Sequence, residues 1–532
     1  EPGVEIGRNG GPGTVSSIFM RGQASANVAV FIDGVPVQRD SYGGLKLVDI
    51  PPSQIEKIEI LRGNMSAVYG EAAVGGAIHI FTRSGKGASG PTASASYGSR
   101  NTSDLNAGYT LNGKEFKLGF SVQRLETDGY SAMNPSQNPT KVNPDDDAFK
   151  RESIFLNGEQ TINDQVAIGF QANRINSDIE YDSTSNPSFG AALPTDLQHA
   201  KQKSSDQTIY GQFKPHSYWS SRITFTQSDY ENRDFYNDAA NGTYEGEQIG
   251  AQWSNTYKVG PGDASFGIDW IDAEFNGISY GSPFAYKRES LGYYVGYSGR
   301  LDRFDYQANV RRDEIKSEYA TSTDEKSADT WLLSAGYQLT DAFKMTGLIS
   351  TAFRAPSPAE LFGVYGNPEL QPAEHSGYEI GGMYEFRNGA LRFTYFDTKV
   401  KNDWIYESGG GVSTPIGKTA NKGVELALNG ASNGINYKFN VVSQDPRKIS
   451  DNTRLLKRAK EYASLSLDTE VAGIDWGTNI VWSGSRTDVS NKSLKPYTVI
   501  NLSAAKKLTP EWTTMLKIEN AFDEVYQLAY GF

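Results

Sequence analysis

The chain has 532 residues, 38% of them hydrophobic, a formal net charge of −12 and no cysteine. Without cysteine there is no disulfide, thiolate metal site or cysteine nucleophile, and the negative charge argues against a nucleic-acid partner. No apolar run reaches the roughly 18 residues of a spanning helix, so a membrane protein of this sequence has to be a closed barrel, which the 30 Tyr, 25 Phe and 8 Trp suit well.

The first 86 residues predict a small domain of short strands separated by glycines. A compact, strand-rich unit ahead of a much longer repetitive segment indicates an insert that blocks or gates something larger, and so points to transport. Its apolar segments are SSIFMRG (16–22), VAVFIDGVPV (28–37), IEKIEILRG (55–63) and SAVYGEAAVGGAIHIFTR (66–83).

From about residue 91 onward, apolar and polar residues alternate with period two, which is typical of strands with two unlike faces. The alternation is clear at 304–311 and at 474–483. Strands that are apolar outside and polar inside are what a barrel with a wet lumen requires. Short turns at one end of such a barrel contrast with long loops at the other, and the sequence has short turns at 161–164, 339–342 and 508–511 and long polar stretches at 134–147 and 237–247.

Residues 89–532 provide about 22 strands at about 20 residues per strand and loop, a size at which the lumen needs a plug. A soluble sandwich, propeller or β-helix is also built from alternating strands, but no fixed repeat of roughly 20 to 50 residues is visible. We therefore expect an all-β membrane protein. Its parts are a 22-stranded antiparallel transmembrane β-barrel at 89–532 and, inside the lumen, an N-terminal α+β plug domain, mostly of strands, at 1–86.

Several motifs in chain order resemble those of the TonB-dependent outer-membrane receptors. The segment 10–85 resembles their plug, and the barrel motifs are TAFRAPSPAELFG (351–363), GNPELQPAEHSGYEIG (366–381), NKGVELAL (421–428) and IENAFDEVYQLAYGF (518–532). The resemblance implies a bacterial outer-membrane location and active uptake of a large scarce nutrient, with energy delivered through TonB. It also implies that the plug segment contacting TonB precedes Glu1 and that one more strand follows Phe532.

Within the family, the likeness is greatest to the cobalamin (vitamin B12) receptors, through GGPGTVSSIFMRGQASANVAVFIDGV (10–35), FGVYGNPELQPAEHS (362–376) and LLKRAKEYASLSLD (455–468). Cobalamin or a related corrinoid is therefore the expected ligand. Haem and a ferric siderophore are the alternatives within transport, and a passive porin or a surface adhesin are alternatives of another class, which a folded domain ahead of the barrel disfavours. The remaining expected partners are outer-membrane lipid and lipopolysaccharide, with a phage or bacteriocin as a further one.

Two arginines and two glutamates are candidates for a contact between plug and barrel. Arg21 and Arg62 each precede a glycine at the end of an apolar plug segment, and Glu379 and Glu425 lie in predicted barrel strands. In the resembling family these positions form an ionic cluster that holds the plug to the wall. Buried charges persist when they are paired; four unrelated solvated charges are the alternative.

Three polar plug loops, at 23–27, 38–44 and 64–72, are expected to face the ligand. They offer hydroxyls, amides and phenols without a cluster of positive charge, which favours a neutral ligand rich in amides over a highly anionic siderophore. Ordinary turn chemistry explains such residues equally well. The candidates are Ser25, Asn27, Ser41, Tyr42, Ser66 and Tyr69.

Acidic clusters in the predicted loops could hold calcium, which takes six to eight oxygen ligands. The resembling cobalamin receptors use calcium to order such loops, and a solvated acidic surface is the alternative. The candidate ligands are Asp147, Asp178, Asp182 and Asp234. No other cofactor is expected.

The four histidines disfavour haem, because related haem receptors place an axial histidine between their FRAP and NPEL motifs. Here these motifs lie at 353–356 and 367–370, and the residues between them include no histidine. His79, His199, His216 and His375 are expected to be isolated residues of the surface or lumen. No nucleophile elbow, phosphate loop or zinc spacing is present, so we expect no enzyme.

Overall fold

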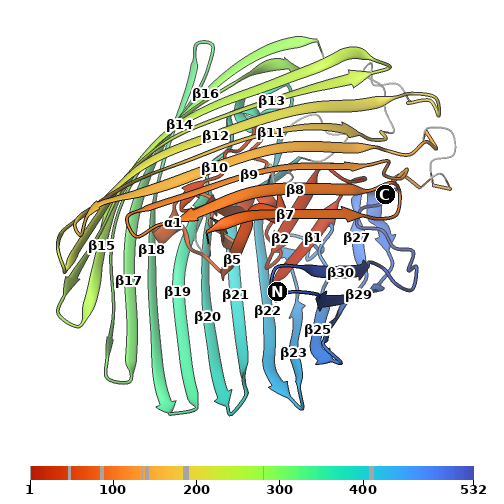
Figure 1. Ribbon diagram of the computed structural model, residues 1–532. Coiled ribbons are helices and arrows are strands. Elements are labelled where there is room, and N and C mark those ends of the chain that lie inside the picture. Colours follow the sequence, from red (N-terminus) through yellow and green to blue (C-terminus); the bar gives the residue numbers. More distant parts are fainter. Residues whose placement is uncertain are drawn as a thin grey trace.

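The computed structural model describes residues 2–45, 50–83, 89–134, 136–137, 143–183, 191–279, 281–406 and 413–532. A barrel of long strands surrounds a small domain formed by the N-terminal residues (Figure 1). None of the described helices is long and apolar enough to cross a membrane.

The plug domain consists of two small sheets. One has the order β4-β3-β6-β5, with β3 and β6 parallel, and the other pairs β1 with β2. Its apolar core lies between them around Met20, Val28 and Ile78, because β-branched residues fill the inner faces of β3 and β6. The elements are β1 (Val4–Arg8), β2 (Ser16–Met20), η1 (Ser25–Asn27), β3 (Val28–Ile32), β4 (Val35–Pro36), η3 (Pro52–Gln54), β5 (Ile55–Arg62), α1 (Ser66–Tyr69) and β6 (Gly76–Thr82).

The barrel sheet is antiparallel throughout its recorded pairings, and its strand order contains 22 strands within the described residues. This confirms the predicted fold class. The strands are β7 (Gly90–Tyr97), β8 (Ser103–Asn112), β9 (Phe116–Thr127), β10 (Phe149–Asn163), β11 (Val166–Glu180), β12 (Gln198–His216), β13 (Trp219–Tyr236), β14 (Ala239–Val259), β15 (Gly262–Ser279), β16 (Ser282–Leu301), β17 (Phe304–Tyr319), β18 (Ser322–Thr340), β19 (Phe343–Arg354), β20 (Ala373–Phe386), β21 (Gly389–Tyr406), β22 (Ser413–Ser432), β23 (Ile435–Gln444), β24 (Arg447–Lys448), β25 (Glu461–Val471), β26 (Ile474–Ser483), β29 (Tyr497–Lys507) and β30 (Thr513–Ile518).

One strand of this order is very short. β24 has two residues and pairs with β22, while β23 pairs directly with β25. After β30, residues 519–532 form turns and bends without a further strand. The strand expected beyond Phe532 stays a prediction.

The alternation predicted from the sequence separates the two faces of each strand. In β13, Ile223 and Phe225 are exposed on the outside, whereas Thr224 and Thr226 are buried in the lumen. An outer apolar face with an inner polar one is the pattern of a barrel in lipid.

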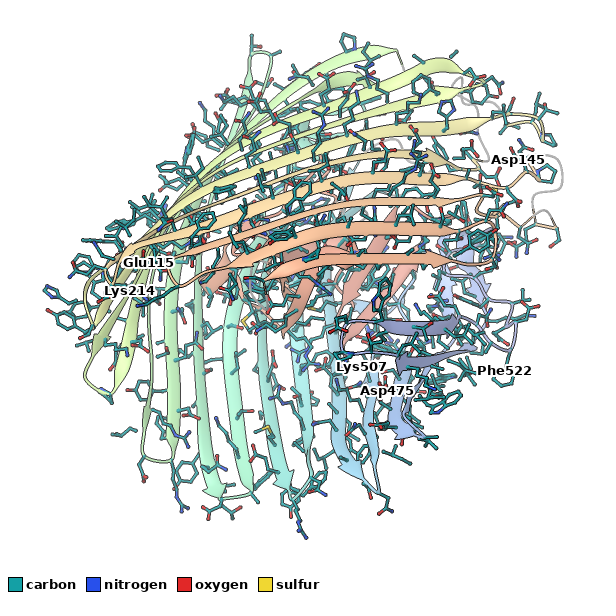
Figure 2. All side chains as sticks on the ribbon, in the orientation of Figure 1. Glu115, Asp145, Lys214, Asp475, Lys507 and Phe522 are labelled. Atoms are coloured by element: carbon teal, nitrogen blue, oxygen red, sulfur yellow. The ribbon has the colours of Figure 1, made fainter. Side chains whose placement is uncertain are left out.

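The two ends of the barrel differ, but one of the two predicted long loops is wrong: residues 239–247 belong to β14, and only Asn237 and Asp238 form the turn after β13. Glu115 and Lys214 lie together at the end with short turns, and Asp145 lies at the far end of the same wall (Figure 2). The long-loop end carries α2 (Pro358–Phe362), η4 (Val489–Asn491) and the hairpin of β27 (Arg486–Asp488) and β28 (Lys492–Leu494). Residues 135 and 138–142 of the predicted long loop 134–147 lie outside the described residues.

The plug is oriented by two contacts with the long-loop end. The amide of Ala359, in α2, donates to the carbonyl oxygen of Ser41 at 3.1 Å, and α1 packs against strands β16 to β19. The plug loop of residues 38–45, hereafter the apex loop, therefore faces the long loops.

Candidate functional site

The four predicted charges between plug and barrel come together in one cluster, hereafter the ionic lock. The Arg21 Nη1 lies 2.6 Å from Glu379 Oε1, and its Nε lies 2.9 Å from Glu425 Oε1. The Nε of Arg62 lies 3.8 Å from Glu425 Oε2, and its Nη1 donates to the carbonyl of Pro2 at 2.9 Å. Arg21 is thus the central cation and Arg62 the peripheral one.

The left-handed backbone of the glycine after Arg62 lets the Glu379 carboxylate lie directly against the plug. Gly63 has φ +93°, and a Cβ there would come within 2.1 Å of Glu379 Oε1, so that a side chain at this position would displace the carboxylate. The Arg21 side chain is 3% exposed and stacks over the Phe396 ring at 4.7 Å. Although burial alone lowers the pKa of Arg21, the two carboxylates raise it, so the guanidinium stays charged.

A cavity of about 450 Å³ separates the plug from strands β14 to β17, to one side of the ionic lock. At the end of the cavity nearest the long loops, hereafter the cavity mouth, the apex loop and the segment after α1 approach the loop that follows β19. Three arginines from distant parts of the sequence line it there: Arg39 in the apex loop, Arg288 in β16 and Arg354 at the end of β19. Only Arg39 belongs to the predicted plug loops, so the expectation that these loops face the ligand without a cluster of positive charge stays a prediction, to which the barrel adds two arginines.

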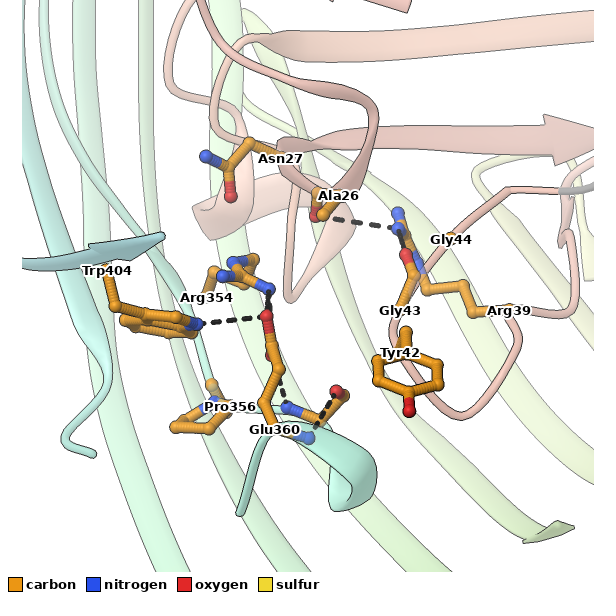
Figure 3. Close-up of polar contacts among 12 residues, drawn as sticks. Ala26, Asn27, Arg39, Tyr42, Gly43, Gly44, Arg354, Pro356, Glu360 and Trp404 are labelled. Atoms are coloured by element: carbon orange, nitrogen blue, oxygen red, sulfur yellow. Dashed lines mark hydrogen bonds and ion pairs between the residues drawn. The ribbon is translucent and has the colours of Figure 1, made fainter. Parts of the chain in front are cut away.

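The three arginines differ in their partners. Arg39 donates to the main-chain carbonyls of Gly43 at 2.9 Å and Ala26 at 3.5 Å (Figure 3), and to that of Val28 at 2.7 Å. Among the described residues it has no carboxylate within ion-pair distance, whereas Arg288 pairs with Glu71 at 2.7 Å and Arg354 with Glu360 at 3.0 Å. Burial lowers the pKa of Arg39 to about 10, and it remains a cation at neutral pH.

A helix in the opposite loop holds Arg354 in place (Figure 3). Ser357 and Glu360 form a capping box at the start of α2. The Glu360 carboxylate accepts from Arg354 and also from the Trp404 indole at 2.9 Å. The guanidinium of Arg354 lies over the Trp404 ring at 4.1 Å, which fixes its plane toward the cavity mouth.

Aromatic side chains stand beside this mouth. Tyr286 stacks with Phe284 at 5.0 Å and lies 5.1 Å from the Tyr319 ring, and Tyr319 stacks with Phe362 of α2 at 6.2 Å. Tyr42 of the apex loop is 50% exposed. The rings of Tyr286, Phe284, Tyr319 and Phe362 belong to one hydrophobic cluster behind the mouth, whereas the aromatic residues that line the cavity include Tyr69 and Tyr294.

The six predicted ligand residues do not form one site. Tyr69 lines the cavity, with its ring centroid 4.7 Å from that of His79 in a tilted contact, while Tyr42 is exposed in the apex loop. The remaining four serve the fold. Ser25 exchanges hydrogen bonds with the main chain of Ile18, Asn27 donates to Gln23, Ser41 is buried under α2, and Ser66 is fully buried with its hydroxyl accepting from the Phe353 amide.

Three of the four predicted calcium ligands line one cleft of about 720 Å³ between the loops before β10 and after β11. Asp147 is buried there and Asp178 is exposed, whereas Asp234 in β13 is not part of its lining. Among the described residues, no group of three His, Cys, Asp or Glu stands close enough to hold a metal ion. Calcium binding here stays a prediction.

These loop carboxylates predict a pH-dependent loop structure. Burial and the neighbouring Asp182 raise the pKa of Asp147 to about 7, and burial raises that of Asp182 to about 6. Both carboxyls are more easily protonated in the folded loops, so their stabilising contribution is complete below about pH 4 and is lost as the pH rises through 6 to 7. We expect faster amide exchange at 128–134 and 143–148 at about pH 8 than at about pH 5.5, after correction for intrinsic rates.

The matched variant Asp147→Asn keeps a neutral side chain at every pH and should flatten this dependence. Equal protection of these loops at both pH values in the unmodified protein would contradict the account. Slower exchange at pH 8 on adding Ca²⁺ would support the calcium prediction, and unchanged exchange would count against it.

The histidines pack against aromatic rings or lie buried in the wall. His79 stacks on Phe31 at 4.8 Å, His199 on Phe235 at 4.6 Å and His216 on Tyr218 at 4.9 Å. His375 is 2% exposed, with neither ring nitrogen hydrogen-bonded. This arrangement presents no pair of axial ligands for haem.

Sequence reasoning missed Arg39, Arg288, Arg354 and Glu71. Arg39 lies in one of the loops predicted to face the ligand, but Arg288 and Arg354 are more than 200 residues away from it in the sequence. The FRAP motif could have pointed to Arg354, because this arginine directly precedes the helix α2 whose Glu360 orients it.

Comparison with known proteins agrees with a fold made of a barrel and a plug domain. A family model described as "TonB dependent receptor-like, beta-barrel" matches residues 123–521, and one described as "TonB-dependent Receptor Plug Domain" matches residues 1–77.

Solved structures with the same fold include three iron-related receptors. The ferric yersiniabactin uptake receptor FyuA from Yersinia pestis has a TM-score of 0.82 at 19% identity, covering 99% of this chain and 90% of that one. The FrpB iron transporter from Neisseria meningitidis has 0.83 at 15% identity, covering 99% and 91%. The ferripyoverdine receptor of Pseudomonas aeruginosa has 0.82 at 15% identity, covering 100% and 80%.

Proposed function

Because the chain belongs to the TonB-dependent receptor family, whose barrel model alone matches residues 123–521, we propose that it takes up an anionic ferric siderophore. Its place is the outer membrane of Gram-negative bacteria, where it works in TonB-dependent transport. The family is one of transport receptors and not a class of enzymes.

The observation that carries the proposal is the cation at the plug apex. Arg39 lies at the cavity mouth with hydrogen bonds only to main-chain carbonyls among the described residues, while Arg288 and Arg354 approach it from the barrel. Charge-assisted hydrogen bonds to a carboxylate or catecholate oxygen are stronger than neutral ones. A ligand carrying several such oxygens fits this mouth better than a neutral corrinoid.

Two further features support an iron chelate. The aromatic rings of Tyr69 and Tyr294 line the cavity and offer flat apolar surface to the organic part of a chelator. The structures compared above include receptors for ferric yersiniabactin and ferripyoverdine. The cobalamin ligand expected from the sequence resemblance becomes the alternative.

Equilibrium binding to the purified protein tests the proposal. We expect a ferric siderophore bearing net negative charge to bind at submicromolar concentration, and cyanocobalamin and haemin to bind much more weakly. The panel should contain catecholate, hydroxamate and carboxylate ferric siderophores, each with its iron-free form as control, with and without Ca²⁺. Tight binding of cyanocobalamin alone would overturn the proposal in favour of the corrinoid, and tight binding of haemin alone would overturn it in favour of haem.

A further inference from the structure

A second ion pair joins the plug to the barrel, at the cavity and apart from the ionic lock. Both carboxylate oxygens of Glu71, which follows α1, lie 2.7 Å from the Nη2 of Arg288 in β16. The same carboxylate accepts from the Ala355 amide at 3.0 Å, and Arg288 Nη1 donates to the Pro356 carbonyl at 2.8 Å. Glu71 therefore ties together the plug, a barrel strand and the loop after β19.

Main-chain contacts extend this attachment to the whole segment 66–72. The Ala72 amide donates to the Phe353 carbonyl at 3.0 Å, and the Phe353 amide donates to the Ser66 hydroxyl at 3.4 Å. Both contacts are to one residue of β19, so the segment containing α1 is fastened at each end. Once the Glu71–Arg288 pair opens, the contacts of this segment with the wall that remain among the described residues are these two neutral hydrogen bonds and the packing of α1 against β16 to β19.

Glu71 occupies the place that an anionic ligand needs. Its carboxylate lines the same cavity as Arg39, Arg288 and Arg354, and the Glu71 side chain is 25% exposed. Both of its oxygens contact one nitrogen of Arg288, which is not the parallel two-nitrogen pairing that guanidinium and carboxylate groups favour. An anion with several acceptors can pair with Arg39 and Arg288 at once.

Release of Glu71 would act on the deeper part of the cavity. Gly70, next to Glu71, packs on the Arg311 guanidinium, since a Cβ at Gly70 would lie 3.0 Å from Arg311 Nη2. Arg311 in turn pairs with Asp269 and Asp313, and these residues line the cavity below Arg288. Movement of the segment 66–72 would therefore widen the space along β15 to β17, while Arg21 holds the plug at β20 and β22.

We propose that the Glu71–Arg288 ion pair, hereafter the latch, is opened by the ligand itself: an anionic group entering the cavity takes Arg288 from Glu71 and frees the segment 66–72. The proposal rests on the anionic ligand of the proposed function. Such a shift requires that the ligand bind the open state more tightly than the closed state. It does so because the ligand can pair with Arg288 only after Glu71 has left this arginine.

The absence of cysteine allows a direct measurement of the opening. Ala67, in α1, is fully buried, and the variant Ala67→Cys places a single thiol there. Its labelling rate with a polar maleimide reports how often the segment opens. In this background we expect Glu71→Gln to raise the rate about tenfold or more. The matched control Glu59→Gln, which removes an exposed plug carboxylate paired with Lys57, should leave it unchanged.

Pyrophosphate serves as the anion probe, titrated at constant ionic strength against sodium chloride. It should accelerate labelling of the Ala67→Cys protein and have no further effect once Glu71→Gln is present. Its affinity should rise in the Glu71→Gln variant, because the internal competitor has been removed. Arg288→Gln should open the segment without pyrophosphate and abolish the response to it.

Two results would overturn the latch: labelling no faster in Glu71→Gln than in the Glu59→Gln control, or labelling of the Ala67→Cys protein that pyrophosphate does not change. Amide exchange of the segment in the cysteine-free chain gives the same comparison without the thiol. Failure of every ferric siderophore to bind, with the latch responding as described, would reject the proposed function alone. Siderophore binding with no response of the segment would reject the latch alone.

Discussion

Arg21→Ala is expected to release the plug from the barrel wall. The variant leaves Glu425, which is 4% exposed, and Glu379 facing each other without their central cation. Breaking a buried ion pair by removing one partner costs about 3–5 kcal/mol. We expect larger and more frequent conductance steps in planar bilayers and greater sensitivity of cells to large antibiotics.

The two arginines of the ionic lock should differ. Arg62→Ala was expected from the sequence to loosen the plug as well, and its longer 3.8 Å contact with Glu425 now predicts a smaller effect than that of Arg21→Ala. Lys57→Ala, on the exposed face of β5, is the matched control and should behave as the unmodified protein. Unchanged conductance and antibiotic sensitivity in both Arg21→Ala and Arg62→Ala would show that the ionic lock does not hold the plug.

Arg39→Gln is expected to weaken binding of the anionic ferric siderophore by about ten- to a hundredfold. Hydrogen bonds to a charged group contribute about 1.5–3 kcal/mol. Without Arg39 the ligand keeps only Arg288, for which it competes with Glu71, while Arg354 stays paired with Glu360. Isothermal titration of the siderophore identified in the binding panel measures the effect.

The control for this variant is Arg83→Gln, at the far end of β6. Its side chain is exposed to solvent, and among the described residues its guanidinium donates to the Ile55 carbonyl alone. A loss of affinity in Arg83→Gln equal to that in Arg39→Gln would point to long-range charge instead of contact. Unchanged affinity in Arg39→Gln would remove the cavity mouth from the ligand site.

The sequence predicted the barrel because each strand in lipid has to separate its faces. Ile223 and Phe225 alternate with Thr224 and Thr226, and this period-two pattern needs no knowledge of which strands are neighbours. The ionic lock could be anticipated for a related reason. Arg21 and Arg62 each precede a glycine within plug motifs, and the family resemblance supplied Glu379 and Glu425 as partners.

The cavity could not be predicted in this way, because its residues meet only after the barrel closes around the plug. Arg39 and Glu71 come from the plug, Arg288 from β16 and Arg354 from β19, and no spacing along the chain relates them. Polar residues that did attract attention, such as Ser25 and Ser66, proved to satisfy main-chain groups of the plug and wall. Serine at a turn bonds to nearby backbone as readily as to a ligand.

The central claim is that an anionic iron chelate binds at the cavity mouth between the plug apex and the barrel. The most direct test is anomalous scattering at the iron edge from crystals of the protein bound to the ferric siderophore selected by the binding panel. The account predicts one iron peak above Arg39, between the loop that carries Arg354 and strand β16. An iron peak elsewhere on the loops, with Glu71 still on Arg288 and the cavity mouth unoccupied, would contradict it.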